Sequence, residues 1–419
     1  MKKKTVFLFL LIISVVLPQS KLTLEDCYGK ARNNYPLIKQ KAYIEQSMDY
    51  NISNVWKGYF PQVTITGQAT YQSDVTSIPI LLPGMKIDPL SKDQYKAVAE
   101  VTQTIYDGGI MASQADIQRR SSEVEDHKIE VELLKVKDRL NQIYFGILLF
   151  DKQLAQTELV KKDLNASLEK INAALINGTA MQSNVDVLKA ELLKTTQKEI
   201  ELESSRKSFF DMLGLLINQP LNENVLLEQP IISLPNKTEE ISRPELKLYS
   251  SQQKMVEEQR GMTLAKILPK ASLFFQGGYG KPTLNMLKNS FDWYYVAGAR
   301  LSWSLSNLYT FRNENEVNEL NKKSVEAQRE TFMLNTKLTL NQQDNEIEKL
   351  KKLIAVDKQI IEIRTSVKEA AKAQLANGVI TSSDFIRELN AEDLAKENLA
   401  IHSIQLLLAE QNYILTSGN

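Results

Sequence analysis

The distribution of proline constrains this 419-residue chain more than any other feature of its sequence. All 12 prolines lie outside two long segments, 90–219 and 283–419. Glycine is also scarce in these segments, and both are rich in Leu, Lys, Glu, Gln and Ala, which favour helices. Because proline breaks helix interiors, the two segments are predicted to be helical blocks.

Each block contains one strong turn signal, an Asn-Gly pair at 177–178 and at 377–378. Each block is therefore predicted to be a helical hairpin. Apolar residues recur at three- and four-residue spacing, as in a packed helix or coiled coil. At 1.5 Å per residue the longer arms would each be roughly 100 Å long. The predicted arms are 110–176 with 182–216, and 308–376 with 382–416.

The chain also repeats itself. Pro36 matches Pro244, and 60–68 matches 268–276, both at an offset of 208 residues. The offset then falls to 200, where 101–105 matches 301–305 and Gly178 matches Gly378. Matching at a fixed spacing indicates a tandem duplication, with eight extra residues in the first copy between positions 71 and 101. The predicted domains are a first repeat at 21–217, a linker at 218–243 and a second repeat at 244–419.

Each repeat is predicted to contain two β-strands. In 62–72 apolar residues and glycine occupy the odd positions, and Gln or Thr occupies every even one. The segment 292–305 alternates similarly, and 95–106 and 270–280 do so less cleanly. Strands of about 11 residues with aromatics near their ends are typical of membrane barrels. Each strand alone would also suit a half-buried strand of a soluble sheet, but four in one exported chain favour the membrane.

Four strands cannot close a barrel, and an open sheet edge in lipid leaves backbone groups unpaired. Copies of the chain must then supply strands, eight from two chains or twelve from three. A barrel of twelve strands would leave a lumen, whereas the interior of an eight-strand barrel is mostly filled by side chains. Lys96, Glu100, Lys270 and Arg300 fall on the polar positions and are expected to face that lumen. Their mixed signs indicate no strong charge selectivity.

The first 20 residues are expected to be a secretory signal peptide. A basic start, Lys2 to Lys4, precedes about 12 apolar residues and Pro18-Gln19-Ser20. A membrane anchor is the alternative, but the apolar run is shorter than the ~20 residues that span a bilayer. The chain is therefore predicted to be exported.

Composition excludes several classes of function. The 51 Lys and Arg residues balance 51 Asp and Glu residues, which argues against a basic nucleic-acid binder. One cysteine and two histidines leave no disulfide and almost no means to build a metal site. The sequence has no phosphate loop or nucleophile elbow, so neither enzyme activity nor a cofactor is predicted. A periplasmic coiled-coil scaffold or adhesin remains an alternative, although it leaves the four strands unexplained.

Several short segments resemble one family in their order and spacing. They are Leu22–Tyr28 with Asn34-Tyr35-Pro36, Tyr59–Gln62, Ile105–Gly109, Asn177-Gly178 followed by Val185–Leu188, and Asn377–Thr381. Over residues 21–419 the chain resembles the TolC-like outer-membrane efflux proteins.

The resemblance implies a homotrimer in the outer membrane of a Gram-negative bacterium. Its fold would be a 12-strand transmembrane β-barrel, four strands per chain, continuous with a 12-helix coiled-coil tunnel in the periplasm. The linker 218–243 would be equatorial. The trimer would be the passive exit duct of a tripartite efflux or type I secretion system, passing small molecules or polypeptide. Its partners would be a periplasmic adaptor (membrane fusion) protein and an inner-membrane transporter.

The hairpin tips are the expected docking and gating end, because they project farthest from the strands. Family members often carry an aperture carboxylate six residues after the tip glycine. Asp384 occupies that position, while Asn184 replaces it in the first repeat and Arg387 stands at a second acidic position. Any ring of carboxylates around the aperture is therefore expected to contain few of them. The alternative for Asp384 is that it stabilises a helix N-terminus. An ordinary capped turn is the alternative for each tip. The candidate tip residues are Gly178, Thr179, Asn184, Asp186, Gly378, Val379, Asp384 and Arg387.

Overall fold

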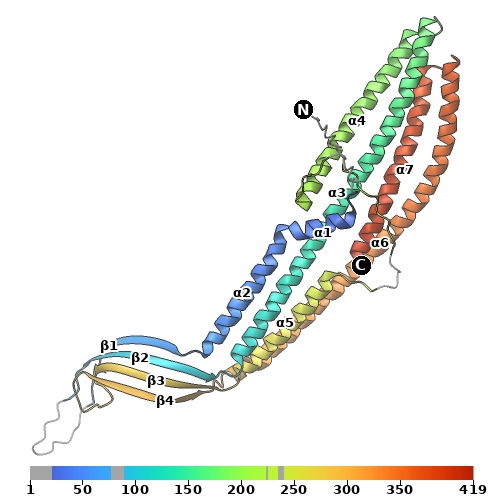
Figure 1. Cartoon of the computed structure of the whole chain (residues 1–419). Helices are drawn as coiled ribbons and strands as arrows, with labels where there is room; N and C mark the ends of the chain where they lie inside the picture. Colours follow the sequence, from blue (N-terminus) through green and yellow to red (C-terminus); the bar gives the residue numbers. More distant parts are fainter. Residues whose placement is uncertain (1–20, 77–88, 223–224, 235–239, 419) are drawn as a thin grey trace, which may run out of the picture. The chain divides into compact units, whose positions relative to one another are not determined.

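The computed structural model describes residues 21–76, 89–222, 225–234 and 240–418 (Figure 1). The expected signal peptide lies outside the described residues, as do 77–88 of the first repeat's extra loop and parts of the linker. The chain divides into two compact units. The first comprises residues up to Ile38 with 132–243 and 335–419, and the second comprises 39–131 and 244–334. Each unit therefore draws on both sequence repeats.

Two helical hairpins dominate the first unit, as predicted. Each long helix ends beside an Asn-Gly turn, and the return helix begins six residues after that end. Both long helices begin in the residues of the second unit and continue without a break into the first. A short helix near the start of the chain, α1, completes this unit. The helices are α1 (Leu24–Asn34), α3 (Ile110–Ile176), α4 (Gln182–Ile217), α6 (Asn307–Ala376) and α7 (Ser382–Ser417).

The core of the first unit surrounds Tyr144 on α3. Its ring is fully buried with Phe145 and Phe210, and its hydroxyl lies 2.8 Å from the carbonyl oxygen of Leu22 and 2.6 Å from that of Glu228. Leu22 also forms a parallel bridge with Leu227. These contacts bind the described part of the linker to the start of the chain, within one core.

The second unit contains the four predicted strands as one antiparallel sheet, in the order β1-β2-β3-β4 (Figure 1). Two further helices precede the strand pairs, and two short 3-10 turns flank the first of them. β4 ends three residues before the predicted 305, because Ser304 and Leu305 already accept hydrogen bonds from the first turn of α6. The elements of the second unit are α2 (Lys39–Trp56), η2 (Lys57–Tyr59), β1 (Gln62–Tyr71), β2 (Asp93–Tyr106), α5 (Pro244–Lys266), β3 (Lys270–Lys281) and β4 (Asp292–Ser302). The 3-10 turn η1 (Pro36–Ile38) comes just before α2 and belongs to the first unit.

The register gives the sheet two distinct faces. Up to a bulge at Thr104 and Tyr106, every paired position joins two even-numbered or two odd-numbered residues. Up to that bulge, the even residues of the four strands therefore share one face, and the odd residues share the other. Among the described residues, β1 and β4 each have a neighbouring strand on one side only.

Candidate functional site

The two hairpin tips share one backbone geometry. Gly178 and Gly378 have φ values of 76° and 69°, in the left-handed region that favours glycine. In each tip the glycine N–H and the next N–H donate back to carbonyls of the last helical turn, at 2.9–3.0 Å. This is the Schellman arrangement that ends helices. A Cβ would meet nothing within 4 Å at either glycine, so backbone conformation rather than space requires glycine there.

The side chains of the second tip form a capping box. The Thr381 hydroxyl accepts a hydrogen bond from the Asp384 N–H at 3.2 Å, and the Asp384 carboxylate accepts from the Thr381 N–H at 3.2 Å. The hydrogen bond from the Thr381 side chain holds the pKa of Asp384 below its usual value. Arg387 approaches the same carboxylate at 3.4 Å. The structure thus brings Asp384 and Arg387 together, and Asp384 stabilises the start of α7.

The first tip lacks this box. Met181 occupies the cap position and makes no side-chain hydrogen bond there. Thr179 instead donates to the Ala174 carbonyl at 3.0 Å, and Asp186 accepts from Gln182 at 2.8 Å. No hydrogen bond joins Asn184 to Asp186 in the described part of the chain. The predicted residues of this tip are therefore neighbours along the helix rather than one polar cluster.

An apolar core lies directly below the tips. Phe385, Leu188 and Leu389 are almost completely buried, with Leu164 and Leu375 in the same cluster. Other apolar side chains of the tips are largely exposed, namely Ile176, Met181 and Val379. Of these residues only Val379 is among the predicted tip residues, although Val185, Leu188 and Leu192 carry the three- and four-residue spacing that marks a buried helix face. Each tip is a firm turn with exposed apolar side chains.

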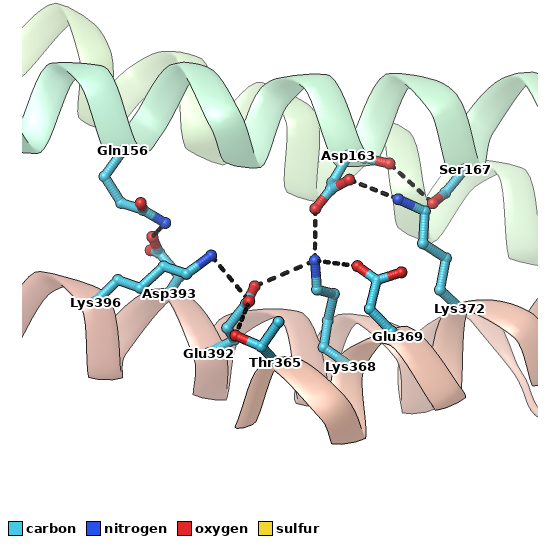
Figure 2. A network of polar contacts seen from close by, with 10 residues as sticks. All are labelled: Gln156, Asp163, Ser167, Thr365, Lys368, Glu369, Lys372, Glu392, Asp393 and Lys396. Atoms are coloured by element: carbon cyan, nitrogen blue, oxygen red, sulfur yellow. Dashed lines mark hydrogen bonds and ion pairs between the residues drawn. The ribbon is translucent and has the colours of Figure 1, made fainter. Parts of the chain in front are cut away.

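A buried charge network joins the two hairpins farther along the first unit (Figure 2). Lys368 on α6 is only 6% exposed, and its ammonium lies 2.9 Å from Asp163 on α3, 2.8 Å from Glu369 and 3.4 Å from Glu392 on α7. Lys372 also binds Asp163, at 2.6 Å, and Lys396 and Thr365 bind Glu392. The network therefore links helices from both repeats.

The pKa values in this network favour its charged form. Burial alone would lower the pKa of Lys368, but hydrogen bonds to Glu369 and Asp163 outweigh burial and raise it. Burial would likewise raise the pKa of Asp163 and Glu392, yet hydrogen bonds from lysines lower both. No sequence signal marked these residues, because charged side chains on long helices usually face solvent.

The predicted lumen residues lie on the even face of the sheet. Arg300 on β4 and Glu100 on β2 form an ion pair at 3.6 Å. Lys96 lies over the Tyr294 ring at 5.3 Å, and Arg300 lies over the Phe274 ring at 4.8 Å. Lys270, opposite Ser302 at the start of β3, joins none of the other three in the described part of the chain.

The odd face of the sheet is apolar and open. Ile65 is 80% exposed, Trp293 77% and Leu301 75%. Aromatic rings cluster where β3 ends and β4 begins, with Tyr279 packed on both Phe291 and Trp293. An exposed apolar face of this size marks contact with a partner or with lipid.

The described residues contain neither a candidate metal site nor a helix suited to spanning a membrane. No group of three or more His, Cys, Asp or Glu side chains there is arranged to hold a metal ion. His402 instead pairs with Asp357 at 2.6 Å, within the first unit. None of the described helices is both long and apolar enough to cross a membrane.

Similarity to known proteins agrees with this arrangement. Residues 27–218 match the model of the outer membrane efflux protein family. No curated protein matches the chain. Three solved structures each align with 94% of the chain, and VceC of Vibrio cholerae does so at 13% identity over 96% of its own length, with a TM-score of 0.67. CmeC of Campylobacter jejuni is 12% identical over 85% of its length, with a TM-score of 0.66. MtrE of Neisseria gonorrhoeae is 15% identical over 88% of its length, with a TM-score of 0.66.

These two kinds of similarity carry different information. At 12–15% identity the solved structures show a common fold, which includes the helical hairpins and the four-stranded sheet. The family match is a match in sequence, and it runs from α1 to the end of α4. It confirms the resemblance drawn from the short segments, and with it the expected location in the outer membrane with the helices in the periplasm. The first repeat therefore matches the outer membrane efflux protein family in sequence, and 94% of the chain shares the fold of VceC, CmeC and MtrE.

Proposed function

We propose that three copies of the chain form one continuous exit duct. Their twelve strands would close a transmembrane β-barrel. Helices α3, α4, α6 and α7 of each copy would form a 12-helix tunnel in the periplasm. The duct would pass small molecules or polypeptide outward without chemical change, as part of a tripartite efflux or type I secretion system.

The sheet is the observation that carries this proposal. Its odd face exposes large apolar side chains, as a lipid-facing surface does. Its edge strands β1 and β4 each lack a second neighbour among the described residues. In hydrocarbon every unpaired backbone group costs several kcal/mol, so β4 of one copy must pair with β1 of the next. Three copies are favoured over two because twelve strands enclose a lumen, whereas eight are mostly filled by side chains.

The exposed side chains of α6 also support assembly. Val317, Leu320, Leu334 and Leu338 are more than half exposed in the single chain. A helix that exposes apolar residues at three- and four-residue spacing is typical of one that packs against another helix. In the trimer a neighbouring copy would cover these residues.

The tips would be where the duct meets its partners, a periplasmic adaptor protein and an inner-membrane transporter. Gly178 and Gly378 hold the reversals, while Ile176, Met181 and Val379 expose apolar surface beside polar Thr179, Asn184 and Asp186. Such a mixed patch on a firm scaffold suits protein docking. Asp384 and Arg387 would lie at the aperture as a neutralised pair rather than as a strong acidic ring.

Membrane extraction followed by mass measurement tests the proposal. The protein should stay in the membrane fraction in high salt and dissolve only in detergent, because lipid contact is apolar and unaffected by ionic screening. Mass measurement in detergent should then give three chains per particle. Release by salt would favour the periplasmic scaffold, and a stable monomer in lipid would contradict the shared barrel.

A further inference from the structure

The even face of the sheet carries more positive than negative charge. Its charged residues are the cations Lys96, Lys270 and Arg300 and the carboxylates Glu100 and Asp292. Asp292, at the start of β4, is paired with Lys288 at 2.5 Å. The remaining three cations face one carboxylate, an excess of two positive charges per chain on this face.

Two of the cations occupy defined positions against aromatic rings. Lys96 lies over Tyr294, and Arg300 lies over Phe274. Each ring in turn lies across a glycine that is its register partner, Tyr294 over Gly278 and Phe274 over Gly298.

The two glycines make room for the rings. A Cβ at Gly278 would lie 2.5 Å from the Tyr294 ring, and one at Gly298 would lie 3.0 Å from the Phe274 ring. Glycine therefore lets each ring lie flat across the sheet, where its face can hold a cation. The glycine–aromatic pairs fix two positive charges in the middle of the sheet.

These cations are only partly neutralised. Glu100 pairs with Arg300, whereas neither Lys96 nor Lys270 has a carboxylate at ion-pair distance in the part of the chain that the structure describes. The Tyr294 hydroxyl beside Lys96 is buried and lacks a hydrogen-bond partner among those residues.

The tips offset only part of this excess, through Asp186, whose carboxylate accepts a hydrogen bond from the neutral amide of Gln182. Asn184 leaves the first tip neutral at the position that corresponds to Asp384, and Arg387 lies 3.4 Å from Asp384 in the second tip. A solute that entered past the tips would meet little net negative charge from these residues.

We propose that Lys96, Lys270 and Arg300 make the duct prefer anionic solutes. The inference rests on the proposed function, because these side chains face solute only if the even face lines a lumen. Three copies would place six excess positive charges around one aqueous passage. The Debye length is about 10 Å at 0.1 M salt, so charges on a lumen wall act well into the passage at low ionic strength. Carboxylated, sulfonated or phosphorylated solutes would pass in preference to cations of similar size.

Ion permeability through the purified trimer in a planar lipid bilayer tests this. Under a potassium chloride gradient around 0.1 M, chloride should be more permeant than potassium. The preference should weaken toward 1 M salt, where the Debye length falls to about 3 Å. The K96Q/K270Q double variant should lose the chloride preference, and E100Q should increase it.

The matched control is K281Q. Lys281 carries the same charge at the end of β3 but belongs to the odd set, so the chloride preference should not change. Each variant is first checked for trimer mass in detergent, and the conservative K96R should retain the preference of the wild type. A conducting wild-type trimer that favours potassium, or K281Q and K96Q/K270Q with equal effects, would overturn the selectivity inference alone. An inserted trimer with no conductance would overturn the duct itself, and the inference with it.

Discussion

The hairpins and the sheet of this chain bury their apolar residues in different ways. In the hairpin unit Tyr144, Phe210 and Phe385 are almost completely buried by the chain's own helices, and Lys368 finds three carboxylates within the same unit. In the described strands of the sheet, Val98 is the only large apolar residue that is buried. The difference indicates that the hairpins are stabilised largely within one chain, whereas the sheet of the proposed trimer would depend on lipid and on further copies.

The largest expected effect is on the hairpins, through K368M. The substitution would leave Glu392, only 3% exposed, and Asp163 without their shared cation. Losing one partner of a buried ion pair costs about 3–5 kcal/mol. Lys372 and Lys396 remain bound to the two carboxylates, so we expect a loss of about 2–3 kcal/mol. Hydrogen exchange of the α3 and α7 amides near the network should accelerate roughly 100-fold.

Two comparisons sharpen that test. K349M removes an exposed ion pair from the same helix and should cost less than about 1 kcal/mol. Because the pKa of Asp163 and of Glu392 is lowered, their stabilisation is present above the unfolded values of about 4 and is lost as pH falls through the folded ones. Wild-type protection should therefore decline in acid, and K368M should be less sensitive to acid. Equal exchange in K368M and K349M would mean that the network contributes little.

A smaller effect is expected in the sheet, from a pair of adjacent substitutions. Ile65 lies on the apolar face and Thr66 on the polar face of β1. A lysine costs about 2–4 kcal/mol at the bilayer midplane and less near an interface. Ile65 is three residues from the start of β1, so I65K should cost about 2 kcal/mol, and T66K should cost little. The measurement is the free energy of folding into lipid vesicles.

The same comparison can be repeated on β4. L301K should impair insertion and S302K should not, because these neighbours also lie on opposite faces. If both members of each pair impaired insertion equally, the odd face would not be the lipid surface. The contrast with the hairpins would then disappear, since neither region would depend on lipid.

Much of the fold could be predicted from local signals. Proline-free blocks, Asn-Gly turns and the alternation of 62–72 depend on neighbouring residues, so the helices and strands lie close to their predicted ranges. The charge network could not be predicted, because Lys368 and Asp163 are separated by 205 residues along the chain. Their contact depends on how two long helices are rotated against each other. The glycine–aromatic pairs likewise depend on the register between β3 and β4, which alternation alone does not determine.

The smallest expected effect is at the two tips, where substitutions test whether stabilisation within the chain extends to the ends of the hairpins. T381A removes the capping box of α7 and should cost about 1 kcal/mol, seen as roughly fivefold faster exchange of the first amides of α7. M181A should change little, because Met181 makes no side-chain cap. The double substitution M181T/N184D introduces the same capping-box side chains into the first tip. It should slow hydrogen exchange of the first amides of α4 by a similar factor. If the transplant gave no protection while T381A lost it, the two tips would differ in backbone as well as in side chains. The near-equal φ values of Gly178 and Gly378 argue against such a difference, so we expect the transplanted cap to work.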